Sequence, residues 1–426
     1  MIDTKTAIEK ITNGEFDNLI TDIYIDSSMI DYQKKRYVHA IEQYETIFCP
    51  DKVAIFSAPG RSEVCGNHTD HQHGMVLATS INLDTIAVSA KNNNDVVRFV
   101  SDGYDMITLD INDLEVNNDE AGTTVSLIRG VLRGLKDHGY KIGGFNAYAT
   151  SDVLVGAGLS SSAAFEVVVG TIISGLYNDM KINSVEIAQI SQYAENVFFK
   201  KPCGLMDQMA CSVGGMVNID FKDPTKPIVK KVPTEFEKYD YSLCIVDTKG
   251  DHVDLTDDYA MIPSEMKKVA NFLGEDYLRD CDSNEFYIRL DEIREAVGDR
   301  PVLRAIHFFN EEYNVKNAVS SLENGKFVEF LDAIRKSGNS SFKYLQNVYT
   351  TRDIQHQNIS VALALSESLL RNYGVCRVHG GGFAGTIQAF VKNDFVSNYK
   401  EFINKIFGEN SCHVLKVRKY GGIKVM

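Results

Sequence analysis

The sequence predicts an α+β protein built in two halves. In the first half, apolar and β-branched runs at 53–60 and 75–90 are typical of strands, and helix-like stretches stand before and after them. In the second half, a strand-like run at 241–247 precedes several helical stretches, and another strand-like run follows at 387–391. Because both halves mix helices with strands, we expect an α+β architecture.

The composition is typical of a soluble globular protein. The 426 residues are 44% hydrophobic and 24% charged, and the chain is long enough for two domains. A net charge of −14 argues against a nucleic-acid or membrane partner, because binding to either needs a basic surface. The net charge does not exclude a phosphorylated substrate, since a local pocket can be electropositive inside an acidic protein.

The cysteines indicate a reducing compartment. All eight are scattered and none forms a CxxC pair, so neither a zinc site nor a thioredoxin-like motif is indicated. The chain shows no secretory signal and no apolar run that approaches the length of a membrane span. We therefore expect a cytoplasmic protein with reduced thiols. A monomer is expected, and an oligomer stays open.

The sequence begins with a predicted helical extension. Apolar residues recur at three- and four-residue spacing across 8–20, and a second helix is expected over 32–47. Neither helix carries obvious chemistry, so we expect a packing role. The strand at 53–60 then ends in Pro59-Gly60, a pair that is typical of a turn.

A polar cluster follows at 61–72 and holds an arginine, a glutamate, an aspartate and two histidines between two strand-like runs. The elements expected after it are strands over 75–90, 96–100 and 107–109, a helix over 124–138 and a strand over 145–149. The last of these strands leads to a loop rich in glycine and serine.

This loop runs directly into an apolar helix that extends to about residue 176. Its residues are Gly156, Ala157, Gly158, Leu159, Ser160, Ser161 and Ser162. Glycine allows positive φ and a close approach to a ligand, and serine is a good helix cap. The helix N-terminus adds unpaired N–H groups and partial positive charge, which favour a phosphate site. Taken alone, the stretch fits equally well a loop that merely caps a packed helix.

A second helix is expected over 184–199, with Ser184 as its N-cap and Glu195 near its end. A glycine-bearing turn then leads into a further helix that carries Asp207, and a strand follows over 216–219. We place a domain boundary after this strand. The predicted units are a helical extension (1–48), a first domain (49–220) and a second domain (221–426).

The second half is mostly helical after its first strand. Helices are expected over 263–272, 300–323, 326–337 and 360–372. A glycine-rich segment at 380–385 precedes the strand at 387–391, and a last strand is expected over 414–417.

Three glycine-bearing segments, at 156–162, 203–207 and 380–385, together favour a pocket for a nucleotide or phosphate. The sequence has no GxxxxGK[ST] motif, so a Walker loop is not indicated. It also lacks a GxGxxG followed by an acidic residue about 20 positions on, which argues against a dinucleotide fold. Phosphoryl transfer needs a phosphate cradle, a Mg²⁺ ligand, a carboxylate for the acceptor and a cation.

The sequence offers a candidate for each of these parts. Ser162 and Glu195 are candidate oxygen ligands for Mg²⁺. Asp207 lies beside a glycine-bearing turn, and Arg61 is its candidate partner, because an arginine neighbour favours an ionised aspartate. A single charged residue is also typical of a solvated surface. The assignment therefore depends on these segments meeting in space.

Four segments together resemble the motifs of a known family. Residues 58–70 look like the galactokinase signature, 156–164 like an ATP-binding loop, 203–208 like a catalytic segment and 379–385 like a glycine-rich third motif. The chain thus resembles the GHMP small-molecule kinases, and within them the galactokinase branch. The resemblance implies a two-domain GHMP kinase fold with the active site in the cleft between the domains.

The resemblance also implies an ATP- and Mg²⁺-dependent sugar 1-kinase that phosphorylates the anomeric hydroxyl of galactose. Asp207 would be the catalytic base or orienting carboxylate, and Arg61 its cationic partner. Ser162 and Glu195 would hold Mg²⁺, and the loop 156–162 would bind ATP. The implied sugar contacts are Asn67, His68, Asp70, Gly204 and Tyr259, with Gly381 and Gly382 against the phosphate or the sugar.

Position 67 departs from this family. Galactokinases usually read Gly-Glu-His-Thr-Asp-Tyr-Asn, where this chain reads Gly-Asn-His-Thr-Asp-His-Gln over 66–72. The family's Glu accepts a hydrogen bond from the sugar near its 6-hydroxyl and would repel a uronic acid, whereas Asn67 is neutral and also donates. Galacturonate kinases of plants resemble this branch, lack that Glu and read Asp-His-Gln nearby, as this chain does over 70–72. A galacturonate 1-kinase, or another sugar 1-kinase, therefore stays an alternative.

Two further departures are the polar run at 61–65 and Ala384, which stand where apolar residues and a glycine are common. A non-catalytic, sugar-sensing regulator related to galactokinases is a third hypothesis. The intact Asp207, Arg61 and serines of the loop argue against it.

Overall fold

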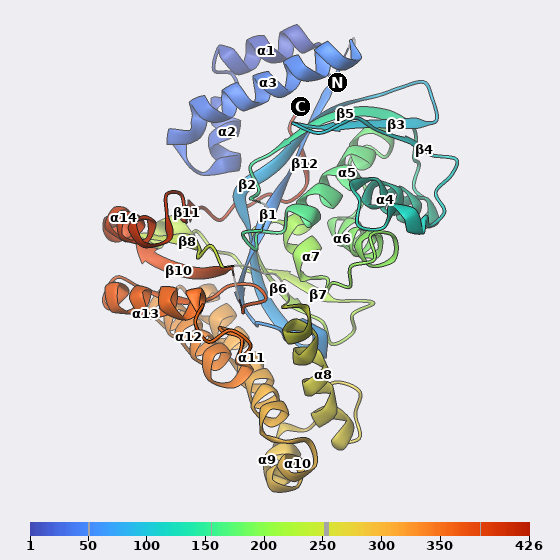
Figure 1. Cartoon of the computed structure of the whole chain (residues 1–426). Coiled ribbons are helices and arrows are strands. Elements are labelled where there is room, and N and C mark those ends of the chain that lie inside the picture. Colours follow the sequence, from blue (N-terminus) through green and yellow to red (C-terminus); the bar gives the residue numbers. More distant parts are fainter. Residues whose placement is uncertain (50–51, 155, 251–254, 384) are drawn as a thin grey trace.

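A computed structural model describes residues 1–426 except 50–51, 155, 251–254 and 384. The described residues form two sheets covered by helices, which confirms the α+β prediction (Figure 1). The larger sheet contains β1 (Ala54–Cys65), β2 (Met75–Lys91), β3 (Val96–Ser101), β4 (Ile107–Asp110), β5 (Phe145–Ser151), β6 (Met216–Asp220), β7 (Ile228–Lys231) and β12 (Ile423–Lys424). The smaller sheet contains β8 (Tyr241–Asp247), β9 (Gly374–Val378), β10 (Thr386–Lys392) and β11 (Cys412–Leu415), in the order β11-β8-β10-β9.

The antiparallel pair of β1 and β2 is the centre of the larger sheet. Strand β2 pairs with β6 through its first residues and with β5 through its last ones, and β3 runs parallel to β5. Strand β1 is buried along its whole length, with Phe56 in one hydrophobic core and Ile55 in another. Burial on both faces explains why the first residues of this strand are mostly apolar.

The turn predicted at Pro59-Gly60 is wrong, because β1 continues through it to Cys65. The pairing with β2 shifts register between Pro59 and Arg61, which marks a β-bulge, and a bulge tolerates a proline that lacks the N–H donor. Beyond the bulge, the Arg61 N–H donates to the carbonyl of Leu159 at 3.1 Å. A Cβ on Gly60 would lie 2.8 Å from that same carbonyl. The Pro-Gly pair thus brings β1 against the glycine- and serine-rich loop.

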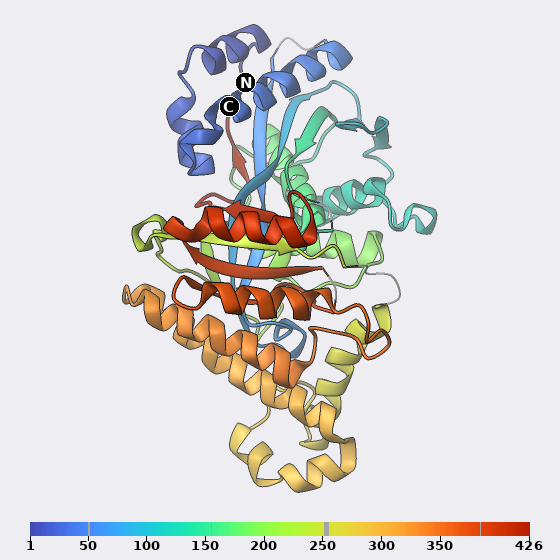
Figure 2. The same cartoon turned by 60° about the vertical axis from the view of Figure 1, so that its left-hand side comes forward.

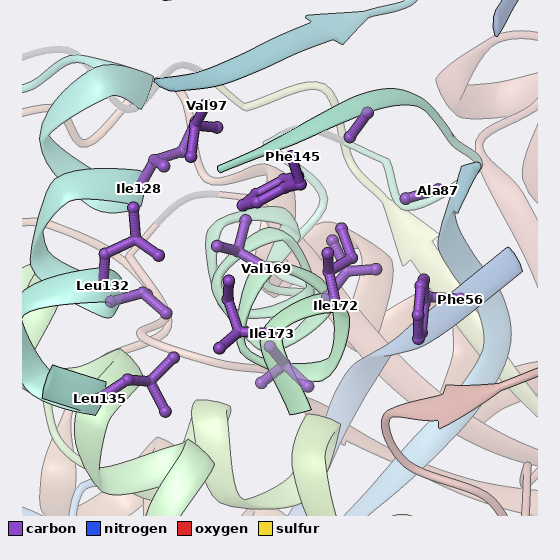
Figure 3. Packing of buried hydrophobic residues seen from close by; sticks show 14 of the residues in the cluster. Phe56, Ala87, Val97, Ile128, Leu132, Leu135, Phe145, Val169, Ile172 and Ile173 are labelled. Atoms are coloured by element: carbon purple, nitrogen blue, oxygen red, sulfur yellow. The ribbon is translucent and has the colours of Figure 1, made fainter. Parts of the chain in front are cut away.

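Four helices cover one side of the larger sheet. They are α4 (Thr124–Asp137), α5 (Ser161–Tyr177), α6 (Ser184–Tyr193) and α7 (Met206–Val213). Phe56 and Phe145 of the sheet pack with Leu132 of α4 and Ile172 of α5 in the core between them (Figure 3). Helix α5 is apolar nearly all round and mostly buried, so it holds the loop at its N-terminus in a fixed place.

The predicted N-cap of α6 is wrong by one residue. Asn183, and not Ser184, is the cap, and its side chain accepts from the Val185 N–H at 2.9 Å. The end of the predicted helix is a π-helical turn, η4 (Ala194–Phe198), which carries Glu195. Such turns occur frequently at functional sites.

The second half contains helices that cover the smaller sheet and helices that pack mainly on other helices. The helices of this half are α8 (Thr256–Phe272), α9 (Ser283–Ile288), α10 (Leu290–Val297), α11 (Asp299–Glu323), α12 (Phe327–Ser340), α13 (Asn358–Leu370) and α14 (Val396–Phe407). Helices α13 and α14 share one core with this sheet, and Figure 2 shows them lying along it. A second core joins Leu77 and Leu159 of the first half to Phe330 and Phe390 of the second half, so it packs the two halves together. No described helix combines the length and the apolar character that a membrane span needs.

The domain boundary predicted after residue 220 stays a proposal, and the sheet pairing suggests how to refine it. Strands β7 and β12 both lie beyond residue 220, yet they pair with β6 and β1 of the larger sheet. We propose two units with the boundary between β7 and β8, and with the last strand returning to the first unit.

The predicted helical extension contains α1 (Thr4–Thr12), α2 (Asp17–Tyr24) and α3 (Ile30–Phe48). These helices pack on the face of the larger sheet opposite to α5, in a core that includes Ile55 and Tyr148. Below them lies Asp84 of β2, which is fully buried between two arginines. Arg36 of α3 lies 2.6 Å from its Oδ1, and Arg418 lies 2.8 Å from its Oδ2. Burial would raise the pKa of Asp84, but the two arginines outweigh burial and hold that pKa below its usual value.

We expect Asp84→Ala to lower the free energy of unfolding by about 3–5 kcal/mol, because it leaves buried arginines without a counter-charge. Urea unfolding followed by circular dichroism measures this change. The matched control is Lys10→Ala, which removes the exposed pair between Lys10 and Glu15 and should change stability little. Equal, small effects of both variants would show that the buried cluster does not anchor the extension.

Candidate active site

The structure brings most of the predicted site residues to one pocket between the two halves. Its described lining consists of Arg61, Glu63, Asn67, His68, Asp70, His71, Cys203, Gly204, Met206, Asp207, Gly380 and Gly381. These residues come from β1 and the segment after it, from the turn before α7, and from the glycine-rich segment after β9. The condition that the sequence left open, convergence in space, is therefore met for Arg61 and Asp207.

Arg61 and Asp207 form a two-pronged ion pair. The arginine Nε lies 2.7 Å from Oδ1 and Nη2 lies 2.6 Å from Oδ2 of Asp207, a fork geometry that is stronger than a single contact. The Ser160 hydroxyl also donates to Asp207 Oδ2. Burial would raise the pKa of Asp207, but Arg61 and Ser160 overcome this and lower it. With 31% of its side chain exposed, this ionised carboxylate is accessible from the pocket.

The glycine- and serine-rich loop lies directly beside this ion pair. Gly156 and Gly158 have positive φ, of 80° and 67°, as predicted for a loop that approaches a ligand. The Arg61 Nη1 group donates to the carbonyl of Gly158. Ala157 and Leu159 have buried side chains that pack in the core, so only their backbone can face a ligand.

The serines do not cap α5 in the way that the sequence predicts. Ser160 occupies the N-cap position with a φ of +56°, and its side chain makes no capping hydrogen bond because it contacts Asp207 instead. The amides of the first helical turn therefore lack a side-chain cap. Unpaired N–H groups with the positive end of the helix dipole are what an anion needs, which favours the phosphate site over the simple cap.

Glu195 is the centre of a second buried cluster, behind the serines. Its Oε1 accepts from the Ser162 hydroxyl at 3.2 Å and from the Lys201 ammonium at 3.0 Å. Its Oε2 accepts from Gln208 Nε2 at 2.7 Å, and the same amide nitrogen also lies 3.2 Å from Glu166 Oε2. Burial, and then the negative charge of Glu195, raise the pKa of Glu166 well above its usual value. The raised pKa favours the neutral form of the Glu166 carboxyl group.

The donor set around Ser162 and Glu195 fits Mg²⁺. Both offer oxygen atoms, and they share a hydrogen bond beside the N-terminus of α5. In the described part of the chain, no three or more His, Cys, Asp and Glu side chains gather into a metal site. Magnesium needs no such cage, because it keeps waters and binds through one or two protein ligands together with substrate phosphates.

The histidine and aspartate of the polar cluster reach the other side of the pocket. The His68 ring donates from Nε2 to the carbonyl of Gly381 at 3.0 Å, and burial together with His71 lowers its pKa to about 4. Asp70 accepts from the His71 N–H and lies against Gly204, where an added Cβ would be 2.0 Å from Asp70 Oδ2. Both side chains are held in place by backbone contacts. The lowered pKa leaves the His68 ring uncharged at neutral pH.

Two predicted sugar contacts lie differently from the rest. Asn67 is only 1% exposed, and the polar atoms of its side chain form hydrogen bonds with other residues of the protein. Tyr259 is absent from the described lining of the pocket. Its hydroxyl donates to the carbonyl of Gly382 at 2.8 Å. A Cβ added to Gly381 would lie only 2.5 Å from its ring. The sugar contact of Tyr259 stays a prediction, and Ala384 lies outside the described residues.

Sequence reasoning missed several residues of this site. Glu63 and Arg377 are an ion pair with Oε1 to Nη2 at 2.9 Å, and both are buried. His379 is also buried, with its ring nitrogens on Ser62 and Thr386. The available signal was a charge inside a predicted strand for Arg377, and for Glu63 a charge in the polar run at 61–65. A buried charge must have a partner, but the sequence does not name it.

Comparisons with known proteins agree with this geometry. The family described as GHMP kinases N terminal domain matches residues 126–215, and the galactokinase galactose-binding signature matches residues 42–91. A galactokinase of Limosilactobacillus reuteri (strain DSM 20016) is 30% identical over 381 residues, which cover 86% of this chain and 93% of the relative. A galactokinase of Streptomyces coelicolor is 28% identical over 358 residues, covering 82% of this chain and 88% of the relative.

Solved structures show the same fold. Lactococcus lactis galactokinase, complexed with galactose, superposes with a TM-score of 0.77 at 22% identity, over 90% of this chain and 98% of that one. Methanococcus jannaschii mevalonate kinase superposes with a TM-score of 0.57 at 16% identity, over 86% of this chain and 98% of that one. The fold and the site define a GHMP kinase. Within that class, the identity and coverage of its relatives show that this chain belongs to the galactokinase family.

Proposed function

We propose that this protein is a galactokinase, which transfers the γ-phosphoryl group of ATP to the anomeric hydroxyl of galactose. The observation that carries the proposal is the ion pair of Asp207 and Arg61, which faces the pocket directly beside the uncapped N-terminus of α5. The carboxylate of Asp207 suits a sugar hydroxyl, and the N-terminus of α5 suits a phosphate. The galactokinases among its relatives support the choice of galactose.

Asp207 acts in this proposal on the acceptor hydroxyl. Its ionised carboxylate orients the hydroxyl by accepting a hydrogen bond. As the anomeric oxygen bonds to the γ-phosphorus and the bond to the ADP oxygen breaks, the hydroxyl proton passes to Asp207. Arg61 lowers the pKa of Asp207, so this carboxylate is a weak base and its role is mostly to orient. A loose transition state needs little deprotonation, which fits a weak base.

The donor side of the reaction belongs to the loop at 156–162. The amides at the start of α5 would bind the phosphates of ATP, and Gly156 and Gly158 allow the backbone to approach them. Ser162 and Glu195 would hold Mg²⁺, which offsets negative charge on the phosphates. Lys201 lies on the same Glu195 oxygen and is exposed enough to move aside for the metal.

A sugar-dependent ADP release assay tests this proposal. The purified protein is given ATP and Mg²⁺ with galactose, galacturonate, glucose, N-acetylgalactosamine or arabinose. We expect the highest kcat/KM with galactose. Failure of every sugar to stimulate ADP release would support the non-catalytic regulator instead, and a clear preference for galacturonate would support the galacturonate 1-kinase.

Gly204→Ala is expected to raise the KM for galactose about 10- to 100-fold and to leave the KM for ATP unchanged. The added Cβ would collide with Asp70 Oδ2, so the carboxylate must turn away from the pocket. The loss corresponds to one hydrogen bond to a charged group, roughly 1.5–3 kcal/mol. Steady-state kinetics with each substrate varied in turn measure both constants. An equal rise in both KM values would instead indicate general damage to the site.

We also propose that the protein works as a monomer in a reducing cytoplasm. All eight cysteines are free thiols, and five of them are buried. Light scattering after size-exclusion chromatography tests the assembly, and a mass near twice 47.5 kDa would contradict it.

A further inference from the structure

Asn67 occupies the position where galactokinases usually carry the glutamate that contacts the sugar, but its side chain has no free donor. Its Nδ2 group donates to Glu63 Oε2 at 3.0 Å and to the carbonyl of Gly380 at 2.7 Å. Its Oδ1 accepts from Asn347 Nδ2 at 2.8 Å. Flipping the amide would place its oxygen against two acceptors, so these contacts define its orientation. Both N–H groups are used, and none remains for a ligand.

The neighbouring carboxylate of Glu63 is the group that the pocket offers in its place. Glu63 lies four residues before Asn67, near the end of β1, and lines the same pocket as Asp70 and Asp207. Its Oε1 accepts from Arg377 Nη2 at 2.9 Å, and its Oε2 accepts from Asn67. An ionised carboxylate has about four acceptor sites, so two protein donors leave acceptor capacity for a substrate hydroxyl.

Arg377 holds this carboxylate in place from behind. It is fully buried on β9, donates through Nη1 to the carbonyl of Val64 at 2.9 Å, and does not line the pocket. Its charge is therefore used inside the protein, where it opposes the rise that burial causes in the pKa of Glu63. Without it, a carboxylate only 3% exposed would not be stable in that position.

We propose that Glu63 is the specificity-determining carboxylate of the acceptor pocket, and that it selects neutral hexoses over uronic acids. This inference rests on the proposed sugar kinase activity. Glu63 accepts a hydrogen bond from a sugar hydroxyl on the side of the pocket near position 67, as the glutamate at that position does elsewhere in the family. Asn67 and Arg377 are positioning residues that act through Glu63.

The other charges of the pocket also disfavour a negatively charged sugar. Its described lining carries the carboxylates of Glu63, Asp70 and Asp207 but only one arginine and no lysine. That arginine, Arg61, already contacts Asp207 through two nitrogens and Gly158 through the third. A uronate would bring a further negative charge, and the described lining has no lysine and no unpaired arginine to pair with it. Each carboxylate some 4 Å away would then cost about 1–4 kcal/mol.

The test compares kcat/KM for galactose and for galacturonate in the wild-type protein, in Glu63→Gln and in Glu63→Gln/Arg377→Met. We expect the wild type to favour galactose at least 100-fold. Both variants should lose about 10- to 100-fold with galactose, and the ratio between the two sugars should narrow, while the KM for ATP stays unchanged. The double variant removes the buried charge that Glu63→Gln leaves unpaired, so it gives a second test if the single variant is unstable.

A matched control, and a variant that exchanges the residues at positions 63 and 67, test whether the effect is specific to Glu63. Glu312→Gln also removes a carboxylate paired with an arginine, Arg279, but Glu312 is outside the described lining and should leave the sugar ratio unchanged. Glu63→Asn/Asn67→Glu moves the carboxylate to position 67 and should recover galactose turnover relative to Glu63→Asn. If galactose is phosphorylated but Glu63→Gln leaves the sugar ratio as in the wild type, this inference is wrong and the proposed function stands. If no sugar is phosphorylated, the proposed function fails first.

Discussion

Asp207→Ala is expected to lower kcat for galactose phosphorylation by about 10³-fold, which is within the usual effect of a positioned acid–base group. The variant loses the carboxylate that orients the acceptor hydroxyl and takes its proton. It also leaves Arg61 without its ion pair, in contact only with the carbonyls of the neighbouring loop. The rate is measured as galactose-dependent ADP release at saturating ATP and galactose.

The control for this variant is its fold and its ATP binding. Thermal unfolding with and without ATP should show that Asp207→Ala is folded and still binds the nucleotide, because the loop at 156–162 is intact. The pH profile adds a second check. The pKa of Asp207 is held below its usual value, so Asp207 stays ionised and its protonation should not reduce the rate between about pH 5 and 8. A rate within tenfold of wild type would contradict the role given to Asp207.

Glu195→Gln is expected to raise the Mg²⁺ concentration needed for half-maximal activity by about 100-fold. Changes even to residues behind a metal ligand typically cost 10- to 100-fold in metal affinity, and here the charged ligand itself is lost. The substitution keeps the size of the side chain, and its one amide oxygen can still accept the hydrogen bond from Gln208. Activity is measured across a Mg²⁺ titration, and calorimetry of Mg²⁺-ATP binding gives a readout that does not depend on turnover.

Glu166→Gln is the matched control for this prediction. Glu166 is buried beside the same Gln208 amide, and burial raises its pKa well above the usual value, which favours the neutral acid, so we expect a neutral amide of the same size to replace it with little electrostatic change. We expect its Mg²⁺ dependence to stay close to wild type. A large shift in Glu166→Gln together with a small one in Glu195→Gln would reverse the assignment of the charged ligand.

Local sequence signals predicted most elements of this fold. The helix over 124–138 and the strand over 75–90 agree with α4 and β2 within a residue, because hydrophobic periodicity is strong in both. The loop at 156–162 and the helix after it were also predictable from glycine, serine and an apolar run. The pairing of Arg61 with Asp207 came from chemical need and family resemblance, and the structure brings the two side chains together.

The errors arose where tertiary contacts override local signals. Pro59-Gly60 is typical of a turn, but the pairing of β1 with β2 absorbs the pair as a bulge. Asn183 caps α6 although Ser184 is equally suitable by type. The sugar contact of Asn67 stays a prediction, but the sequence did not reveal that protein partners already use its polar atoms. Its partners, Glu63 and Gly380, lie four and more than 300 residues away, and no periodicity reports such contacts.

The measurement that tests the central claim most directly is ³¹P nuclear magnetic resonance of the reaction with ATP, Mg²⁺ and galactose. We predict loss of the γ-phosphate signal of ATP and growth of a single sugar phosphate signal, coupled to the anomeric proton, in the wild type and not in Asp207→Ala. The coupling identifies the phosphorylated oxygen, so the experiment tests both the reaction and its site. Release of inorganic phosphate alone, or a phosphate on another hydroxyl, would contradict the proposal that Asp207 and Arg61 direct phosphoryl transfer to the anomeric oxygen.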